Sequence, residues 1–376
     1  MKKKLMAAAA AAVLLLGSCG GSGSASSSAA PPVSSAKAEA TEIKGTETKE
    51  TETEETRTEE TRTEETKTEE TGTAAAALKG GMEGGSELHF TTGGDQGTYY
   101  GFGCVLAKKV GETTDTIVTA IPSGGSVANI EAMDAGDADL GFVQSDVIAY
   151  AREGIRLFED IGPVDSFSAV AALYMEQVQI VTLDESIKSI ADLKGRNVSI
   201  GAAGSGVYFS ALDCLAVYGL TEDDINPAYQ SFSDSAEALL EGRIDAAFVV
   251  AGAPTTAVTA LAEEKKIFLV GIDDGHMEKL AEASPYYSRT VIPKEVYNTP
   301  EDVPTAAVGA VIVADNDVPG ADIYNFLYGV FEHTDEITAE HEKGAELDLA
   351  FAASVTSVPY HPGAKKYFAE KGINLE

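Results

Sequence analysis

From residue 88 onward, short runs rich in β-branched and apolar residues alternate with longer segments of helical length. Strands that are separated by helices usually pair in parallel sheets through right-handed crossovers. The uninterrupted apolar character of these strands is typical of sheets that helices cover on both faces. The pattern predicts an α/β fold with strands at 88–92, 116–121, 140–143, 198–200, 246–250 and 267–270, and helices at 99–110, 127–135, 146–153, 208–218, 255–265, 320–332 and 338–349.

Two further extended runs, residues 170–183 and 308–313, lie outside this alternation. The first is a candidate for a strand that passes from one lobe to another, and the second is a candidate for the returning strand. The roughly 300 residues of the globular part also exceed the usual size of one hydrophobic core. We expect two α/β lobes with a ligand cleft between them, in which residues 86–177 and 305–376 form lobe 1 and residues 178–304 form lobe 2.

The N-terminus has the three parts of an export signal in order. Lys2, Lys3 and Lys4 precede an apolar run at 7–16, which is too short to span a bilayer. The following Leu16-Gly17-Ser18-Cys19 resembles the lipobox of bacterial lipoproteins. It implies that residues 1–18 are a lipoprotein signal peptide, that Cys19 is the lipidation site, and that the protein is extracytoplasmic and lipid-anchored to the outer face of the cytoplasmic membrane. The alternative is ordinary signal cleavage beside an incidental cysteine.

Residues 19–85 have the composition of a lipid-anchored, disordered acidic tether. After a Gly/Ser/Ala-rich start, a five-residue repeat of the type Thr-Glu-Glu-Thr-Arg runs through residues 53–67. A period of five fits neither a helix nor a strand, and the repeat has no apolar surface to bury, so it is expected to stay unfolded. A spacer that lifts the receptor off the membrane is one interpretation, and low-complexity drift without a selected length is the other.

Charge and residue spacing argue against several classes of function. The formal net charge of −33 disfavours nucleic acid and anionic lipid as partners, because both bind basic surfaces. The five histidines are scattered without metal-ligand spacing, so neither a metal nor another cofactor is expected. Residues 124–128 approximate a nucleophile elbow, but Ala128 replaces its last glycine, and no enzyme is predicted. Cys104 and Cys214 are interpreted as buried free thiols, with a disulfide left open.

Five loops share one design, since each follows a predicted strand, is rich in Gly, Ser or Thr, and leads into a helix. Ligands bind outside the carboxyl ends of parallel strands, and helix N-termini offer unpaired N–H groups and partial positive charge there. Together such loops can hold a carboxylate without any arginine. For Ser126, Ser205 and Thr255, ordinary helix capping remains an equal alternative. The loops lie at 91–100, 122–126, 144–146, 201–206 and 251–255.

From about Leu88 onward, the chain resembles the TAXI solute receptors (TRAP-associated extracytoplasmic immunogenic proteins). The most specific match is Ser123-Gly124-Gly125-Ser126 combined with Gln144-Ser145-Asp146. The other matching stretches are Thr92-Gly93-Gly94 with Gly97-Thr98-Tyr99-Tyr100, Asn129, Gly136-Asp137-Ala138-Asp139-Leu140, Tyr174 with Glu176, Gly204-Ser205-Gly206, Asp302-Val303-Pro304-Thr305, and His361-Pro362-Gly363-Ala364.

The resemblance implies a type II periplasmic-binding-protein fold that closes on its ligand by hinge motion. It also implies a monomeric receptor that delivers a small carboxylate or amino acid, such as glutamate, glutamine or a 2-oxoglutarate-like dicarboxylate, to TRAP transporter membrane subunits. Val207 departs from the family, where a hydroxyl residue is more usual. Alternatives are the receptor of an ABC importer or sensor kinase, and a surface antigen without a transport role. The implied ligand-binding residues are Gly94, Thr98, Tyr99, Ser126, Asn129, Gln144, Ser145, Tyr174, Ser205, Gly206, Val207, Pro254 and Thr255.

Overall fold

The computed structural model describes residues 79–375. The predictions on the signal peptide, on Cys19 and on the tether up to residue 78 therefore lie outside the described residues. The end of the predicted tether needs a correction. Gly80 N–H donates to Thr113 O at 2.7 Å, and Met82 N–H donates to Asn325 Oδ1 at 2.6 Å, so residues 79–85 pack on the globular part instead of belonging to a disordered segment.

The described strands form one sheet with the order β2-β1-β3-β10-β4-β7-β5-β6, to which β8 and β9 add at β4 and β10. Two of them are long and pair with each other antiparallel along most of their length. The bounds are β1 (Glu87–Thr91), β2 (Ile117–Ile121), β3 (Leu140–Gln144), β4 (Phe167–Thr182), β5 (Asn197–Ser199), β6 (Asn226–Ala228), β7 (Ala246–Ala251), β8 (Phe268–Leu269), β9 (Ser288–Ile292) and β10 (Val303–Asp315).

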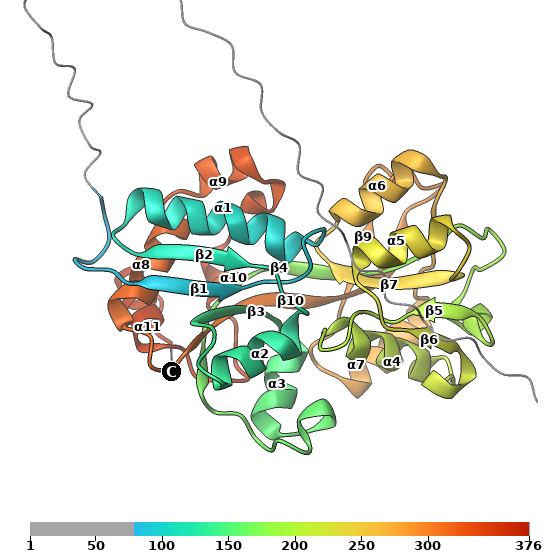
Figure 1. Ribbon diagram of the computed structural model, residues 1–376, viewed down its shortest axis with the longest axis horizontal. Coiled ribbons are helices and arrows are strands. Elements are labelled where there is room, and N and C mark those ends of the chain that lie inside the picture. The colour runs from blue at the N-terminus through green and yellow to red at the C-terminus, as the bar shows by residue number, and fades with distance from the viewer. Residues whose placement is uncertain (1–78, 376) are drawn as a thin grey trace, which may run out of the picture. The chain divides into compact units, whose positions relative to one another are not determined.

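Each half of the sheet repeats one arrangement. In the first half, β1 lies parallel between β2 and β3, and β10 closes it antiparallel to β3. In the second half, β5 lies parallel between β6 and β7, and β4 closes it antiparallel to β7. The two long strands β4 and β10 connect the halves, as Figure 1 shows. The two-lobed α/β fold of the type II periplasmic-binding-protein class is thus confirmed, with the crossing strands where the extended runs predicted them.

Helices cover both faces of each half (Figure 1). The first half carries α1 to α3 and α8 to α11, and the second carries α4 to α7. The α-helices are α1 (Thr98–Thr113), α2 (Ser126–Asp134), α3 (Ser145–Glu153), α4 (Val207–Val217), α5 (Phe232–Leu240), α6 (Thr256–Glu264), α7 (Asp274–Ala283), α8 (Gly320–Phe331), α9 (Thr334–Glu340), α10 (Leu349–Ala352) and α11 (Pro362–Glu370). Short 3-10 helices lie at Arg156–Phe158, Ile190–Leu193, Glu222–Asp224 and Glu342–Glu346.

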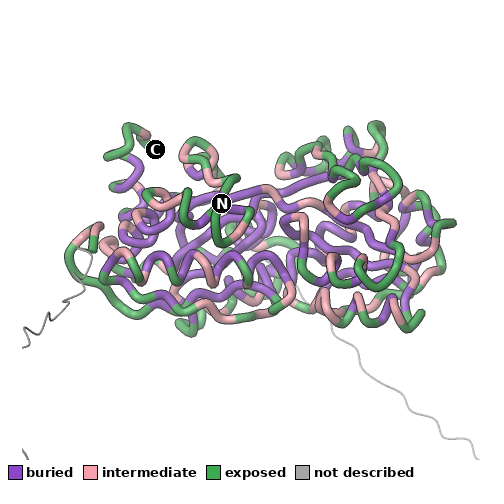
Figure 2. Tube along the Cα trace, turned by 90° about the horizontal axis from the view of Figure 1, so that it is seen from above, coloured by how far each residue is buried: buried purple, intermediate pink, exposed green. Residues whose placement is uncertain are grey.

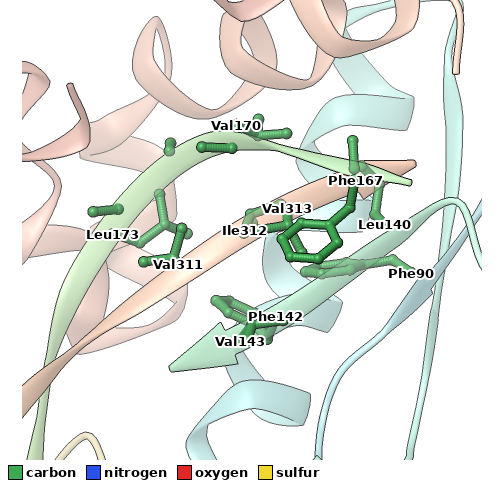
Figure 3. Close-up of a cluster of buried hydrophobic side chains, with 14 of the residues drawn as sticks. Phe90, Leu140, Phe142, Val143, Phe167, Val170, Leu173, Val311, Ile312 and Val313 are labelled. Carbon is green, nitrogen blue, oxygen red and sulfur yellow. The ribbon is translucent and has the colours of Figure 1, made fainter. Parts of the chain in front are cut away.

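The buried side chains fall into separate cores for the two halves. The core of the first half draws on residues 88–174 and 310–368, with Phe209 reaching in from α4. Its centre holds aromatic and branched side chains from β1, β3, β4 and β10, which Figure 3 shows packed against one another. The second half has two smaller clusters, one on each side of its sheet, drawn from residues 178–308. Figure 2 shows the buried strands running inside both halves beneath exposed helices and loops.

The predicted helix at 338–349 is wrong. The structure ends α9 at Glu340, forms a 3-10 turn at Glu342–Glu346 and starts the short α10 at Leu349. His341 adopts an extended backbone (φ −149°, ψ 128°) and its ring accepts a hydrogen bond from Lys343 N–H, which ends the helix there. Gly344 then packs directly on the backbone of Thr338, where no side chain fits.

Five strands and α-helices of the described chain have no counterpart in the predicted pattern: β6, β9, α5, α7 and α11. Both cysteines in the described residues are free, as favoured, but only Cys214 is buried and Cys104 is half-buried. No helix within residues 79–375 is both long and apolar enough to cross a membrane.

Candidate ligand-binding cleft

A cavity lies where the loops of the two halves meet. Its empty volume is about 570 Å³, including its open mouth. Loops after β1, β2 and β3 supply one wall, and loops after β5, β6 and β7 supply the other, with β4 between them. The lining residues are Gly93, Gly94, Gly97, Thr98, Tyr99, Ser123, Gly124, Gly125, Ser126, Gln144, Glu176, Ala202, Ser205, Gly206, Val207, Gln230, Ser231, Phe232, Val250 and Ala251.

The N-terminal ends of four helices lie at this cavity. Its wall contains the first residues of α1, α2 and α4, and the N-cap residue Gln144 of α3. None of the four has a hydrogen bond from its first turn to the side chain of its N-cap residue, which is Gly97, Gly125, Gln144 and Gly206 respectively. Some other helices of the described chain have a side-chain cap, for example α5 by Ser231, whereas α6, α8 and α9 also lack one. In α2 the N–H groups of Val127 and Ala128 already donate to Gly204 O, so the N–H donors and partial positive charge that attract an anion lie mainly at the starts of α1 and α4.

The capping alternative for three hydroxyl residues does not hold. Ser126 is the first residue of α2, and its Oγ accepts from Gln144 N–H at 3.1 Å. Ser205 lies before the N-cap of α4, and its Oγ donates to Ala202 O at 2.7 Å. Thr255 occupies the N-cap position of α6, but its Oγ1 bonds to Gly252 O and Gln179 Nε2 instead of a first-turn N–H.

The structure brings eight of the thirteen predicted site residues to the cavity wall. They come from four of the five predicted loops and the helix starts that follow them, which the sequence placed at the same sheet edge. They are Gly94, Thr98, Tyr99, Ser126, Gln144, Ser205, Gly206 and Val207. The other five, Asn129, Ser145, Tyr174, Pro254 and Thr255, do not line the cavity.

Asn129 lies behind the wall, and its side chain is fully used by the protein. Its Nδ2 donates to Thr92 O and to Phe142 O, both at 2.7 Å, and its Oδ1 accepts from Ser123 Oγ at 2.6 Å. No donor remains for a ligand. The prediction that Asn129 contacts the ligand is therefore corrected: its amide joins the loops after β1 and β2 to β3.

The remaining four residues have similar supporting positions. Ser145 Oγ accepts from Gly309 N–H at 3.0 Å and so ties α3 to β10. Tyr174 is buried on β4, and its ring packs edge-on against Phe102. Pro254 and Thr255 lie at the end of the fifth loop, away from the cavity. Of this region, only Ala251 and the preceding strand residue Val250 line the cavity. Their predicted ligand contacts find no support in these positions.

Sequence reasoning missed Glu176 and a sixth loop with Gln230, Ser231 and Phe232. Glu176 stands inside an apolar run and was noticed only as part of the TAXI match. The sixth loop follows β6, whose sequence Asn-Pro-Ala has no apolar pattern. The polar segment from Gln230 to Ser233 before an amphipathic stretch was the available signal for a helix start there.

Glu176 is the one acidic residue of the cavity lining, which contains no lysine, arginine or histidine. Its side chain is 1% exposed, and Tyr99 OH donates to Oε2 at 2.7 Å. Burial raises the pKa of the Glu176 carboxyl to about 8, although the Tyr99 hydrogen bond and the charge of Lys343 act in the opposite direction. Burial also raises the pKa of Tyr99, with the neighbouring carboxylate adding to the effect.

The two halves touch across the cavity through direct hydrogen bonds. Val127 and Ala128 N–H of α2 donate to Gly204 O at 3.0 and 3.1 Å. On the opposite side, Thr98 Oγ1 donates to Gly252 O at 2.7 Å. Gln144 Nε2 also reaches Ser210 Oγ of α4 at 3.4 Å. The structure therefore shows a closed arrangement of the two lobes.

Two glycines of the second lobe permit this close approach. A Cβ on Gly206 would collide with Gln144 Oε1 and come within 3.0 Å of Ser126 Oγ. A Cβ on Gly252 would lie 2.5 Å from Lys343 Cε and 3.1 Å from Thr98 Cγ2. Both positions face side chains of the first lobe, so closure requires glycine there.

The fold and the cleft together define a class: a two-lobed α/β protein with a small, anion-attracting cavity between its lobes. A model of the NMT1-like family matches residues 90–372, which is most of the chain, and the protein belongs to that family. Within residues 79–375, no group of three or more His, Cys, Asp or Glu side chains is placed to hold a metal ion.

Several solved structures are similar at low identity. The alkanesulfonate-binding protein SsuA from Xanthomonas axonopodis pv. citri bound to MOPS is 16% identical over 75% of this chain and 83% of that chain, with a TM-score of 0.44. A putative L-cystine ABC transporter from Listeria monocytogenes is 17% identical over 70% and 98%, with a TM-score of 0.43. An ancestral arginine-binding protein bound to glutamine is 17% identical over 68% and 96%, with a TM-score of 0.44. These similarities are too low to bear on the ligand of this chain.

Proposed function

We propose that this protein is an extracytoplasmic solute-binding lipoprotein of the TAXI type, which captures a small carboxylate for the membrane subunits of a TRAP transporter. Glutamate, glutamine and 2-oxoglutarate-like dicarboxylates are the ligands proposed first. In this proposal the protein acts as a monomer, lipid on Cys19 holds it at the outer face of the cytoplasmic membrane, and lobes 1 and 2 have the boundaries predicted above.

The observation that carries the binding function is the convergence of helix N-termini from both lobes, above all those of α1 and α4, on one cavity. Each such terminus contributes roughly 0.3–1 kcal/mol to anion binding at exposed sites, and more where water is excluded. Hydroxyl and amide donors of Ser126 and Gln144 add to these. Micromolar affinity needs about 8 kcal/mol, which this set of donors can supply in an enclosed site.

Binding and closure are coupled in this proposal. The ligand contacts α1, α2 and α3 from one lobe and α4 from the other, so it interacts with the closed form more strongly than with an open one. A ligand shifts a conformational equilibrium only through such a difference in affinity. The transporter subunits would then recognise the closed pair of lobes.

A thermal-shift screen of the chain from residue 20 onward tests the binding function. The library contains L-amino acids, 2-oxo acids and C4–C6 dicarboxylates. A ligand that binds only the folded protein adds about 2.7 kcal/mol at 100 times its dissociation constant, which gives a clear rise in melting temperature. Absence of any shift across the library would contradict a receptor for small carboxylates.

The anchor and the transporter need separate experiments. Replacement of Cys19 by serine is expected to move the protein from the membrane fraction to the soluble fraction of the export compartment or medium. Co-purification of the liganded protein with TRAP membrane subunits, and not with those of an ABC importer, is expected for the TAXI assignment. The reverse result would retain the receptor function and reject the TRAP partner.

A further inference from the structure

The cavity has two chemically different regions. Helix N-termini and neutral donors line most of it, and these favour a negative group on the ligand. Glu176 introduces the opposite preference at the wall formed by β4. A ligand with two carboxylates places one of them next to Glu176, where the two acidic groups repel each other. A ligand with one carboxylate and one ammonium group has a favourable partner in both regions.

The position of Glu176 determines which of its carboxylate oxygens is available to a ligand. It lies on β4 opposite Val308 of β10, where the chain passes between the lobes. Tyr99 occupies Oε2, and Oε1 has no hydrogen-bond partner among the described residues. Because the Glu176 carboxylate lines the cavity and Oε1 accepts no hydrogen bond from the described residues, a donor group of a ligand can bind this oxygen there.

The described side chains around Glu176 do not neutralise its carboxylate through an ion pair, so a positive group of the ligand can do so. The charged and titratable side chains that act on Glu176 from adjoining elements are Tyr99, Tyr174, Asp146 and Lys343. Lys343 is the only cation among them, and its Nζ is bound to Glu346 Oε1 at 2.5 Å. No cation within the described residues forms an ion pair with Glu176 itself.

We infer that Glu176 is the specificity-determining residue of this cavity and that it binds the ammonium group of a zwitterionic α-amino acid, whose carboxylate lies against the helix N-termini. The inference rests on the proposed receptor function and narrows it. It selects amino acids over dicarboxylates and 2-oxo acids of the same skeleton.

The inference carries a proton-linkage signature. With a pKa of about 8, Glu176 holds a proton at pH 7 in the ligand-free protein. An ammonium group favours the ionised carboxylate, so binding near pH 7 releases close to one proton. Affinity therefore rises about tenfold for each unit by which the pH increases toward 8, and it levels off above 8. A dicarboxylate favours the protonated form, and its affinity falls as the pH passes 8.

The experiment is isothermal titration calorimetry with matched pairs of ligands on the chain from residue 20 onward. Each pair is an L-amino acid and its 2-oxo acid, beginning with L-glutamate and 2-oxoglutarate. Titrations at pH 6.5 and 7.5, each in two buffers of different ionisation enthalpy, give affinity and the number of protons released. Glu176→Gln keeps the side-chain shape and removes the charge, and Glu278→Gln, which is exposed on α7, is the matched control.

The expected result is an amino acid that binds at least tenfold more tightly than its 2-oxo acid and releases a proton. Glu176→Gln is expected to weaken its binding at least about 30-fold and to remove the pH dependence, because one partner of a buried charge pair is lost. Melting temperatures within a few degrees of the original protein establish that the variant folds.

Two results overturn the inference in distinguishable ways. Tighter binding of a 2-oxo acid or dicarboxylate, with affinity that falls as pH rises, rejects Glu176 as an ammonium site and leaves the receptor function intact. The same holds if Glu176→Gln leaves amino-acid affinity unchanged. Absence of binding by both members of every pair rejects the receptor for small carboxylates as well.

Discussion

The carboxylate of Asp146 is fully buried but lacks hydrogen-bond partners within residues 79–375 that would compensate for its burial. The residue is fully buried at the start of α3, and neither Oδ1 nor Oδ2 has a hydrogen-bond partner among the described residues. Burial, and next the charge of Asp213, raise its pKa to about 7, while the nearby backbone N–H groups of Asp146 and Val147 and then the charge of Arg156 act in the opposite direction. Ionised Asp146 is therefore unfavourable in the folded protein.

This predicts stability that increases on acidification. A carboxyl with a raised pKa in the folded state stabilises the protein fully below its unfolded pKa of about 4, and this contribution is lost as pH rises through about 7. Asp146→Asn is expected to raise the unfolding free energy at pH 8 by a few kcal/mol at most and to flatten its change between pH 5.5 and 8. Urea unfolding at both pH values measures this, with exposed Asp160→Asn as control. An unchanged pH profile in Asp146→Asn would contradict the assignment.

Substitutions of Asn129 and Gln144 are expected to have different effects, because Asn129 has a structural role and Gln144 a binding role. Asn129→Ala leaves the carbonyl groups of Thr92 and Phe142 without their donor, so it is expected to lower the unfolding free energy by roughly 2–4 kcal/mol. Gln144→Ala, at the cavity wall, is expected to weaken ligand binding with little change in stability. Chemical unfolding and calorimetry on both variants test the contrast. A stable Asn129→Ala protein that fails to bind ligand would restore Asn129 to the binding site.

The sequence predicts which residues lie at the sheet edge better than it predicts whether their side chains point into the cavity. Glycines and small hydroxyl residues in a strand-to-helix loop have few alternatives to lining the edge, so Gly94, Ser126 and Gly206 were placed correctly. Asn129 lies one helical turn after Ser126, and its direction depends on carbonyl groups of two other strands. Glu176 is recognised only when β4 is known to border the cavity.

At the level of elements, the approach of α4 to α2 and α3 depends on Gly206. Its φ of −69° suits any residue, so Gly206→Ala leaves the loop unstrained, but the added methyl meets Gln144 in the closed form. A collision of this kind costs about 1–3 kcal/mol, which corresponds to ligand binding weakened roughly 5- to 150-fold. Calorimetry measures the loss, and Gly111→Ala on α1, where a Cβ meets nothing within 4 Å, is the control. Undiminished affinity in Gly206→Ala would show that the lobes do not close at this contact.

Elements with a strong apolar period were predicted, and those defined by capping or tertiary contacts were not. The crossing strand β4 stands out because it is apolar over a length that no ordinary strand needs, whereas for β10 only the central apolar run at 308–313 was predicted. The C-terminal segment could not be divided correctly, because the break between α9 and α10 depends on the backbone of His341 and on the contact of Gly344 with Thr338. Such contacts leave no periodic signal in the sequence.

At the level of the whole molecule, the hydrogen bonds between lobes describe one end of a hinge motion. Spin labels at exposed Glu131 of the first lobe and Glu263 of the second, in a Cys104→Ser background, report the distance between them. Addition of a bound ligand is expected to shorten and narrow the distance distribution, because the ligand joins the loops of both lobes. A distribution that stays the same at saturating ligand would contradict a closing receptor.

Hydrogen–deuterium exchange of the chain from residue 20 onward tests the central claim most directly, namely that the ligand's anionic group binds to uncapped helix N-termini. With a ligand found in the screen, slower exchange is predicted at the first backbone amides of α1 (Thr98 and Tyr99) and of α4 (Val207 and Tyr208), from the two lobes together. Protection confined to other surfaces, with unchanged exchange at both helix starts, would show that the cleft does not bind the ligand in this way.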